Sequence, residues 1–349
     1  MCRRARVPWG VLLGGLAVFL VTNCIKGAWE ASVDSERRLE GEKELYARLL
    51  GPLSPEDPKL LPVLRERYLT PPSSKPYNLS TDPLYQKLRT YGSWVFIHPQ
   101  IKKLFGDRRG GFFVEAGALD GERLSNTLWL EQELGWIGLL IEPNSVNYKN
   151  LLTKHRKAWS SHTCLSSQPY PKEEVFVSLS KKVRQESKVI REAYDLHGSS
   201  HVLGVTLDSR LYDNQLRASD KSYSVVQCFP LVSYLLALNV STVDLLSLDV
   251  QGVEKDVLNN FPWSRVVVRV IVVEVVHRET YDEAFVEYMK SKNFTLVFFR
   301  GEDYIFVRNG DPLLKKVQAV TLVMNRPAKD PTSPSSSSEL PQRGNKSHR

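Results

Sequence analysis

Short apolar segments alternate with segments of helical character between residues 112 and 275, and this alternation constrains the fold more than any other feature. Most of these apolar segments are almost continuous, which is typical of strands buried on both faces. Strands that alternate with helices favour a parallel sheet covered on both sides. The sequence therefore predicts an α/β fold with a mostly parallel, doubly wound sheet and an antiparallel C-terminal strand pair. The expected strands are 112–114, 136–141, 161–165, 243–248 and 266–275, then the pair 294–299 and 304–307; the expected helices are 125–134, 230–238 and 253–258.

An apolar run at residues 7–25 follows Arg3, Arg4 and Arg6. A spanning helix needs about 17–25 apolar residues, and arginine is enriched on the cytosolic side of such helices. The run therefore predicts a type II signal anchor, with a cleaved signal peptide as the alternative. Both interpretations place the rest of the chain in the lumen or outside the cell. We expect endoplasmic reticulum and Golgi membranes, with the endosome and plasma membrane as further destinations.

The regions outside the alternating segments suggest a division of the chain. Prolines interrupt the region before residue 80, and the C-terminal residues are too polar to form a core. The expected parts are a cytosolic tail (1–6), the anchor (7–25), a lumenal stem (26–80), the main domain (81–315) and a disordered tail (316–349).

The formal net charge of +8 does not by itself indicate a nucleic-acid partner. Arg3, Arg4 and Arg6 precede the apolar run, and Arg343, Lys346 and Arg349 lie in the polar tail. No basic run interleaved with aromatic residues lies between them, which indicates a solvated basic surface. We therefore expect a single-span membrane association and no nucleic-acid partner.

Two features fit an oxidising, glycosylating compartment. Cys164 and Cys228 are the only cysteines in the expected domain, and in such a compartment a disulfide is favoured over a metal site, with two buried thiols as the alternative. Asn78 begins an N-glycosylation triplet in a proline-rich loop and is the expected glycan site. The triplets at Asn239 and Asn293 lie beside expected strands, which disfavours them.

A glycine-containing turn follows the first expected strand. Gly117 and Gly121 let the backbone turn tightly and approach a ligand, and Glu115 ends the strand. Glu142 ends the next strand, where a carboxylate can hold the ribose hydroxyls of a nucleotide-like cofactor. The G-x-G-x-x-G pattern of pyrophosphate binders is missing, and Glu115 would repel a pyrophosphate. The pattern favours S-adenosylmethionine, whose cationic methionine end Glu115 would face.

A second group of candidates follows two later strands. Asp249 ends the strand at 243–248, Gly252 makes the turn after it, and Glu254 opens the next helix. His277 follows the strand at 266–275 and is a candidate general base. The candidate catalytic residues are therefore Asp249, Glu254 and His277, and we predict no metal ligands.

These two stretches resemble the FkbM methyltransferase family, from about residue 99 to residue 307. FVEAGALDG (113–121) corresponds to the family's cofactor loop, LLIEPN (139–144) to its ribose-binding strand end, and DLLSLDVQGVE (244–254) to its aspartate–glycine–glutamate signature. The resemblance implies a Rossmann-like class I methyltransferase fold that binds S-adenosylmethionine. The implied cofactor-binding residues are Glu115, Gly117, Ala118, Gly121, Glu142, Pro143 and Asn144. Gln251 stands where the family usually has an acidic residue.

SNTLWLE (125–131), GWIGLLIEPN (135–144) and HRKAW (155–159) resemble the subgroup around the insect protein Star, a type II membrane protein. This resemblance implies a role in endoplasmic reticulum to Golgi or endosomal trafficking, with transmembrane cargo such as EGF-receptor ligand precursors as partners. The alternative is an active O-methyltransferase that modifies a lumenal glycan, lipid or small molecule. Because a shared fold does not fix function, both hypotheses stand at this point.

Overall fold

The computed structural model describes residues 52–83, 93–179, 200–205, 220–275 and 281–317, with a few isolated positions between 26 and 35. Within these ranges no helix is both long and apolar enough to cross a membrane. The run expected to form the anchor, 7–25, lies outside the described residues, as does most of the expected tail from residue 318 onward.

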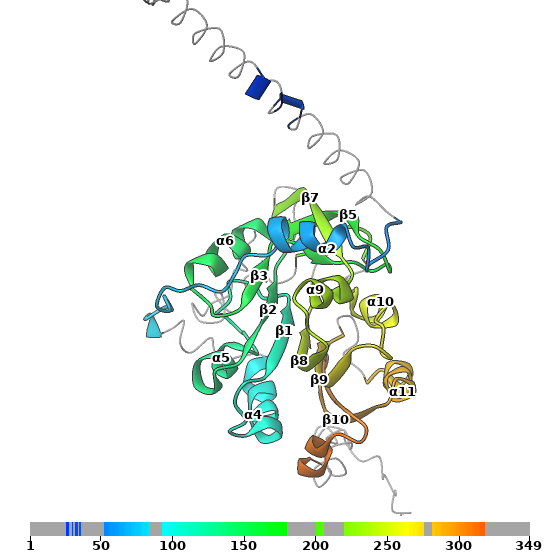
Figure 1. Ribbon diagram of the computed structural model, residues 1–349. Helices are drawn as coiled ribbons and strands as arrows, with labels where there is room; N and C mark the ends of the chain where they lie inside the picture. The colour runs from blue at the N-terminus through cyan, green and yellow to red at the C-terminus, as the bar shows by residue number, and fades with distance from the viewer. Residues whose placement is uncertain are drawn as a thin grey trace, which may run out of the picture.

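A seven-stranded sheet forms the centre of the domain (Figure 1). Its order is β10-β11-β9-β8-β1-β2-β3. The five strands from β9 to β3 are parallel, and β11 lies antiparallel between β9 and β10. This topology confirms the predicted mostly parallel α/β sheet with an antiparallel C-terminal pair. The strands are β1 (Phe112–Ala116), β2 (Ile137–Ile141), β3 (Trp159–Ser161), β8 (Thr242–Leu248), β9 (Val267–Glu274), β10 (Phe294–Arg300) and β11 (Asp303–Arg308).

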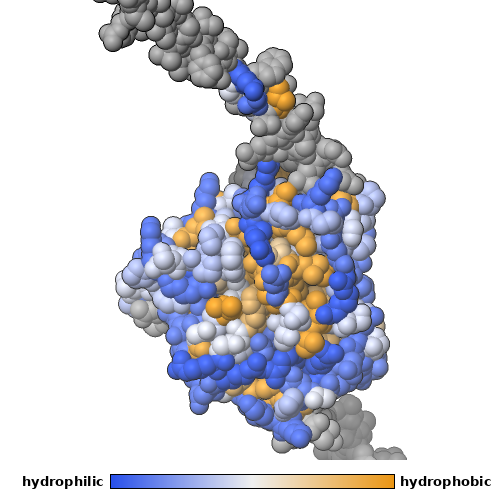
Figure 2. All heavy atoms as spheres, in the orientation of Figure 1, coloured by the Kyte–Doolittle hydropathy of each residue, from blue (hydrophilic) through white to orange (hydrophobic). Residues whose placement is uncertain are grey.

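Helices cover both faces of this sheet, and each strand supplies alternate side chains to the two faces. In β1, for example, Val114 belongs to one buried cluster and Phe113 to the other. The first cluster packs under α9 (Leu231–Ala237), α10 (Glu254–Asn259) and α11 (Glu283–Ser291), and the second under α4 (Ser93–Phe105), α5 (Leu128–Leu134) and the 3-10 helix η4 (Pro312–Lys316). A further helix, α6 (Ser145–Thr153), follows β2. On the side of the molecule shown in Figure 2, apolar residues gather in a central band between hydrophilic margins.

A second, four-stranded sheet was not expected. Its order is β4-β7-β5-β6, with β4 (Cys164–Leu165), β5 (Lys172–Leu179), β6 (His201–Val202) and β7 (Lys221–Phe229). The single strand expected at 161–165 is therefore divided, because β3 pairs with β2 in the large sheet while β4 pairs with β7. Cys164 and Cys228 lie directly opposite each other in the β4–β7 pair and are joined by a disulfide.

The segment 52–80, which we expected to belong to a separate stem, packs against the domain. Leu53, Leu60, Leu64 and Leu69 are buried in the first cluster. They lie in or beside two short helices, α2 (Leu60–Val63) and η1 (Leu64–Tyr68), which rest on α9 (Figure 1). Burial of each leucine side chain stabilises this packing by about 1.5–3 kcal/mol, although the prolines around it prevent long regular helices. Residues 53–69 are therefore part of the packed core of the domain.

Candidate functional site

The turn after β1 brings three strand ends together. Gly117 has φ +85, and a Cβ added there would lie 1.9 Å from the backbone oxygen of Asp249, so only glycine fits. The backbone N–H of Gly117 donates to the carbonyl of Ile141 at the end of β2, and the N–H of Asp249 donates to Ala116 at the end of β1. The ends of β1, β2 and β8 are thus held in contact around one glycine.

Glu115 is buried beside this turn, and its carboxylate organises the loop that follows. It accepts hydrogen bonds from the backbone N–H of Asn126 at 2.7 Å and from the hydroxyls of Ser125 and Thr127 at 2.8 and 2.6 Å. Burial raises the pKa of Glu115, while the nearby Arg156 and these hydrogen bonds oppose the shift. The hydrogen bonds hold residues 125–127 in a loop, so the helix expected from residue 125 begins only at Leu128.

Glu142 follows β2 and is also buried. Its Oε2 accepts from the backbone N–H of Leu119 at 2.8 Å. Its Oε1 accepts from the backbone N–H of Asn144 at 2.8 Å and from the side-chain amide of Asn147 at 3.5 Å. Burial raises the pKa of Glu142 to about 8, because these donors only partly replace the lost water. A carboxylate oxygen has two lone pairs, so Oε2 can still accept one more hydrogen bond, while Oε1 already accepts two.

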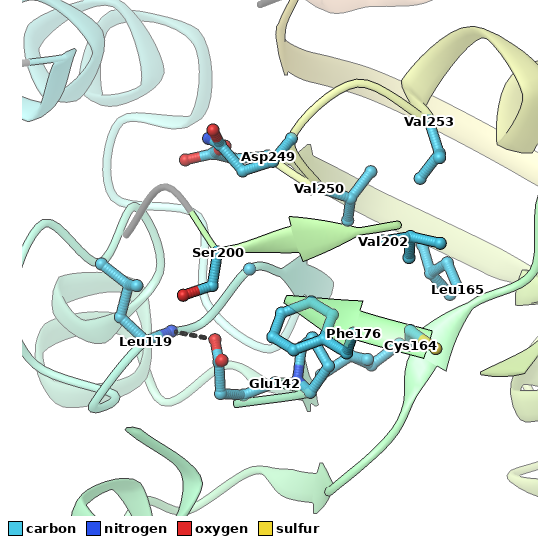
Figure 3. A pocket seen from close by; sticks show the side chains of 14 residues that line it. Leu119, Glu142, Cys164, Leu165, Phe176, Ser200, Val202, Asp249, Val250 and Val253 are labelled. Atoms are coloured by element: carbon cyan, nitrogen blue, oxygen red, sulfur yellow. Dashed lines mark hydrogen bonds between the residues drawn. The ribbon is translucent and has the colours of Figure 1, made fainter. Parts of the chain in front are cut away.

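A pocket opens at these strand ends. Figure 3 shows Glu142 and Asp249 on opposite sides of it, with side chains of the second sheet forming an apolar wall between them. That wall consists of Leu165 on β4, Phe176 on β5 and Val202 on β6. The second sheet therefore closes the side of the pocket that the large sheet leaves open.

The predicted cofactor residues divide into two groups. Gly117, Glu142 and Pro143 line the pocket, and Glu115 lines a neighbouring one. The others support the loops instead. The N–H of Ala118 donates to Ile141, the carbonyl of Gly121 accepts from Arg156, and the Asn144 side chain caps α6.

The neighbouring pocket is acidic, and it shares Gly117, Leu119 and Asp249 with the first. Asp249 accepts a hydrogen bond from the Gln251 amide at 2.7 Å, and its carboxyl group also hydrogen-bonds that of Glu274. Burial raises the pKa of Asp249 to about 6, and the charge of Asp249, followed by burial, raises the pKa of Glu274. Asp303, which pairs with Glu274 across β11 and β9, has its pKa raised to about 7 by burial.

The structure does not place the other two catalytic candidates, Glu254 and His277, in either pocket. Glu254 lines neither pocket; its carboxylate accepts from the backbone N–H groups of Val250 and Gly252 and so closes the loop after β8. Burial raises the pKa of Glu254 to about 7. His277 lies outside the described residues. Among the residues that the structure describes, no group of three or more histidine, cysteine, aspartate or glutamate side chains is arranged to hold a metal ion.

Sequence reasoning missed Phe176, Ser200 and Val202, which line the first pocket, and Asp303, which lines the second. The β-branched and aromatic run Val175, Phe176 and Val177 in β5 was the available signal for a further strand. Nothing in the sequence indicated that this strand would cover the ends of β2 and β8.

Comparison with known proteins gives one match. The sequence model of a protein family described as "Methyltransferase FkbM domain" matches residues 115–305, more than half of the chain, and this range contains both pockets. No curated protein and no solved structure matched the chain.

Proposed function

The chain belongs to the FkbM methyltransferase family, and we propose that its first pocket binds S-adenosylmethionine, with Glu142 holding the two ribose hydroxyls. The observation that carries this proposal is the geometry of Glu142. Its carboxylate is buried at a strand end and lines a pocket. Its Oε2 accepts one hydrogen bond and has a free lone pair, and one of the two bonds to its Oε1 is a long one of 3.5 Å from Asn147. One ribose hydroxyl would donate to the free lone pair of Oε2, and the neighbouring hydroxyl would replace the long bond from Asn147 at Oε1.

The rest of the pocket fits the same ligand. Phe176, Leu165 and Val202 offer an apolar wall to a flat base, and ligand pockets typically combine such a wall with a few polar groups that fix orientation. Gly117 keeps the turn free of a side chain between the two pockets. Asp249 lies at the boundary between them, so a ligand that spans both would pass beside its carboxyl group.

We further propose that the acidic pocket receives the methyl acceptor, a hydroxyl group of a lumenal glycan, lipid or small molecule. S-adenosylmethionine supplies an electrophilic methyl group when bound. Asp249, with a pKa of about 6, is largely ionised at neutral pH and can accept the proton of a hydroxyl group placed against it. Methyl-labelled S-adenosylmethionine should label a component of a lumenal extract with wild-type protein. If the Asp249→Asn variant labels the same component equally fast, Asp249 has no such role.

We expect cofactor affinity to weaken as the pH falls below about 8. The diol favours the ionised form of Glu142, whose pKa in the free protein is about 8, so binding below that pH releases a proton. The dissociation constant should rise by up to about tenfold for each unit of pH between 8 and 6.

Equilibrium dialysis with labelled S-adenosylmethionine at several pH values measures this slope. The Glu142→Gln variant is the matched control, because its side chain keeps a similar shape and cannot titrate. Equal slopes in the two proteins would show that Glu142 does not control binding.

A second proposal concerns the whole chain. We propose that it is a Star-like type II membrane protein. It would assist trafficking of transmembrane cargo, such as EGF-receptor ligand precursors, from the endoplasmic reticulum to the Golgi or the endosome. The arginines before the apolar run at 7–25 and the segments SNTLWLE and GWIGLLIEPN support it. In this arrangement residues 1–6 are cytosolic, 7–25 form the anchor, and all later residues, including the tail at 316–349, are lumenal. Unchanged export of such a cargo from cells that lack the protein would contradict the trafficking role.

Lumenal placement predicts a glycan on Asn78. Asn78 is exposed, and its side-chain amide donates one hydrogen bond to the carbonyl of Thr153 at 3.0 Å, which leaves the second N–H group available. Endoglycosidase treatment should increase the gel mobility of wild-type protein made in mammalian cells, and untreated Asn78→Gln protein should run faster than untreated wild type. Absence of both shifts would contradict lumenal placement.

A further inference from the structure

A groove lies near the start of β9, at the opposite end of this strand from the two pockets described above. The connection from α10 to β9 and the turn from α11 to β10 enclose it. Its lining includes three aromatic side chains, Phe261, Trp263 and Phe294. Ser264, Lys292 and Arg308 add polar groups to this lining. Aromatic rings beside hydrogen-bond donors suit a sugar ring, which has apolar C–H faces and oxygen acceptors at its edges.

Trp263 is held rigidly in this groove. Its ring packs edge-on against Phe261 and Phe294, at centroid distances of 4.8 and 5.2 Å. Its indole N–H donates to the carbonyl of Leu258 at 3.0 Å. The indole is only partly buried, so part of its fixed ring surface is open to a ligand. Because the side chain is already ordered, binding there costs the protein little conformational entropy.

Asn293 also lines this groove, in the turn between α11 and β10. Asn293 has a φ of +71, which is typical of a tight turn, and the residue is exposed. The backbone N–H donates to Lys290 and the carbonyl accepts from Asn309, which fixes the turn. Among the residues that the structure describes, none forms a hydrogen bond with the Asn293 side chain, whereas the Asn78 amide donates to Thr153.

Asn293, Phe294 and Thr295 form an N-glycosylation triplet. The sequence alone disfavoured this triplet because it adjoins a strand. The structure reverses that argument, since Asn293 precedes β10 in an exposed turn and only Phe294 is buried.

We propose that Asn293 carries an N-linked glycan whose first sugar ring lies in the groove against Trp263. The inference rests on the lumenal placement in the proposed function. In this modification the amide nitrogen of Asn293 bonds to the anomeric carbon of a lipid-diphosphate-linked sugar. The bond to the diphosphate breaks with its electron pair, and the amide nitrogen loses one proton. The Lys292 and Arg308 side chains then donate to oxygens of the sugar, whose C–H face packs on the indole ring.

The test uses the full chain produced in mammalian cells. Glycopeptide mass spectrometry should find Asn293 modified, and Thr295→Ala should abolish that modification while leaving Asn78 modified. Asn293→Gln should lower the unfolding temperature by about 2–4 °C. This is the shift that a loss of about 1 kcal/mol causes in a domain of roughly 150–250 residues. Trimming the wild-type glycan to a single N-acetylglucosamine should leave the unfolding temperature unchanged, because that ring makes the contact.

Two controls separate packing from modification. Asn239 is also exposed with a positive φ and begins a triplet, but it does not line the groove, so Asn239→Gln should leave the unfolding temperature unchanged. In a Trp263→Leu background, Asn293→Gln should cause no further loss.

The outcomes are distinguishable. A modified Asn78 with an unmodified Asn293 would overturn this inference alone. Neither residue modified would overturn both this inference and the lumenal placement. A modified Asn293 whose loss leaves the wild-type unfolding temperature unchanged would overturn the packing against Trp263.

Discussion

Replacing Glu142 by alanine should weaken binding of S-adenosylmethionine by about a hundredfold at pH 8. The proposed contact consists of two hydrogen bonds from the ribose hydroxyls to the Glu142 carboxylate. Hydrogen bonds to charged groups are worth about 1.5–3 kcal/mol each, and about 1.4 kcal/mol corresponds to tenfold in affinity. Equilibrium dialysis of the two purified proteins with labelled cofactor measures the change.

Two variants make this experiment specific. Glu142→Gln keeps one oxygen that can accept from the loop, so its affinity should lie between those of wild type and Glu142→Ala. Glu287→Ala removes an exposed carboxylate on α11 that pairs with exposed Lys290 and lines neither pocket, so this variant should bind like wild type. Equal, tight binding by wild type and Glu142→Ala would show that Glu142 does not hold the ribose.

Removing the disulfide should cause the largest loss of stability. Cys164 and Cys228 are separated by 64 residues, and in the chain-entropy model a loop of that length stabilises the folded state by about 4 kcal/mol. In a domain of about 150–250 residues this corresponds to a fall of roughly 8–16 °C in unfolding temperature. The double variant Cys164→Ala/Cys228→Ala, compared with wild type by thermal unfolding, measures it.

The disulfide should also affect the pocket, because Cys164 and the adjacent Leu165 line it. We therefore expect weaker cofactor binding in the double variant even below its unfolding temperature. A reducing agent is the matched control: it should destabilise wild type and leave the double variant unchanged. An unfolding temperature within about 2 °C of wild type would contradict a stabilising bridge.

The large sheet could be predicted because its strands are buried on both faces and therefore almost continuously apolar. The rule that parallel strands end at one edge also placed Glu142 and Asp249 on the same side of the domain, and both line the first pocket. The second sheet could not be predicted in this way. The first half of β7, from Lys221 to Val225, is exposed, and β4 has only two residues, so neither presents a buried-strand pattern.

Two details of the site depend on tertiary contacts that periodicity does not carry. The apolar pattern of 125–134 indicated a helix throughout, but Ser125 and Thr127 are bound by Glu115 and remain in the loop. Asp303 reaches the acidic pocket because the register of β11 against β9 places it opposite Glu274. That register belongs to a pairing between strands far apart in the sequence, and the apolar pattern of each strand does not fix which carboxylates lie opposite one another.

The most direct test of the central claim is calorimetric titration of the purified protein with S-adenosylmethionine at pH 8, where about half of Glu142 is ionised in the free protein. We expect one site per chain in wild type, displacement by S-adenosylhomocysteine, and binding weaker by about a hundredfold in Glu142→Ala. No binding of either ligand to folded wild-type protein would contradict the assignment of this pocket as a cofactor site.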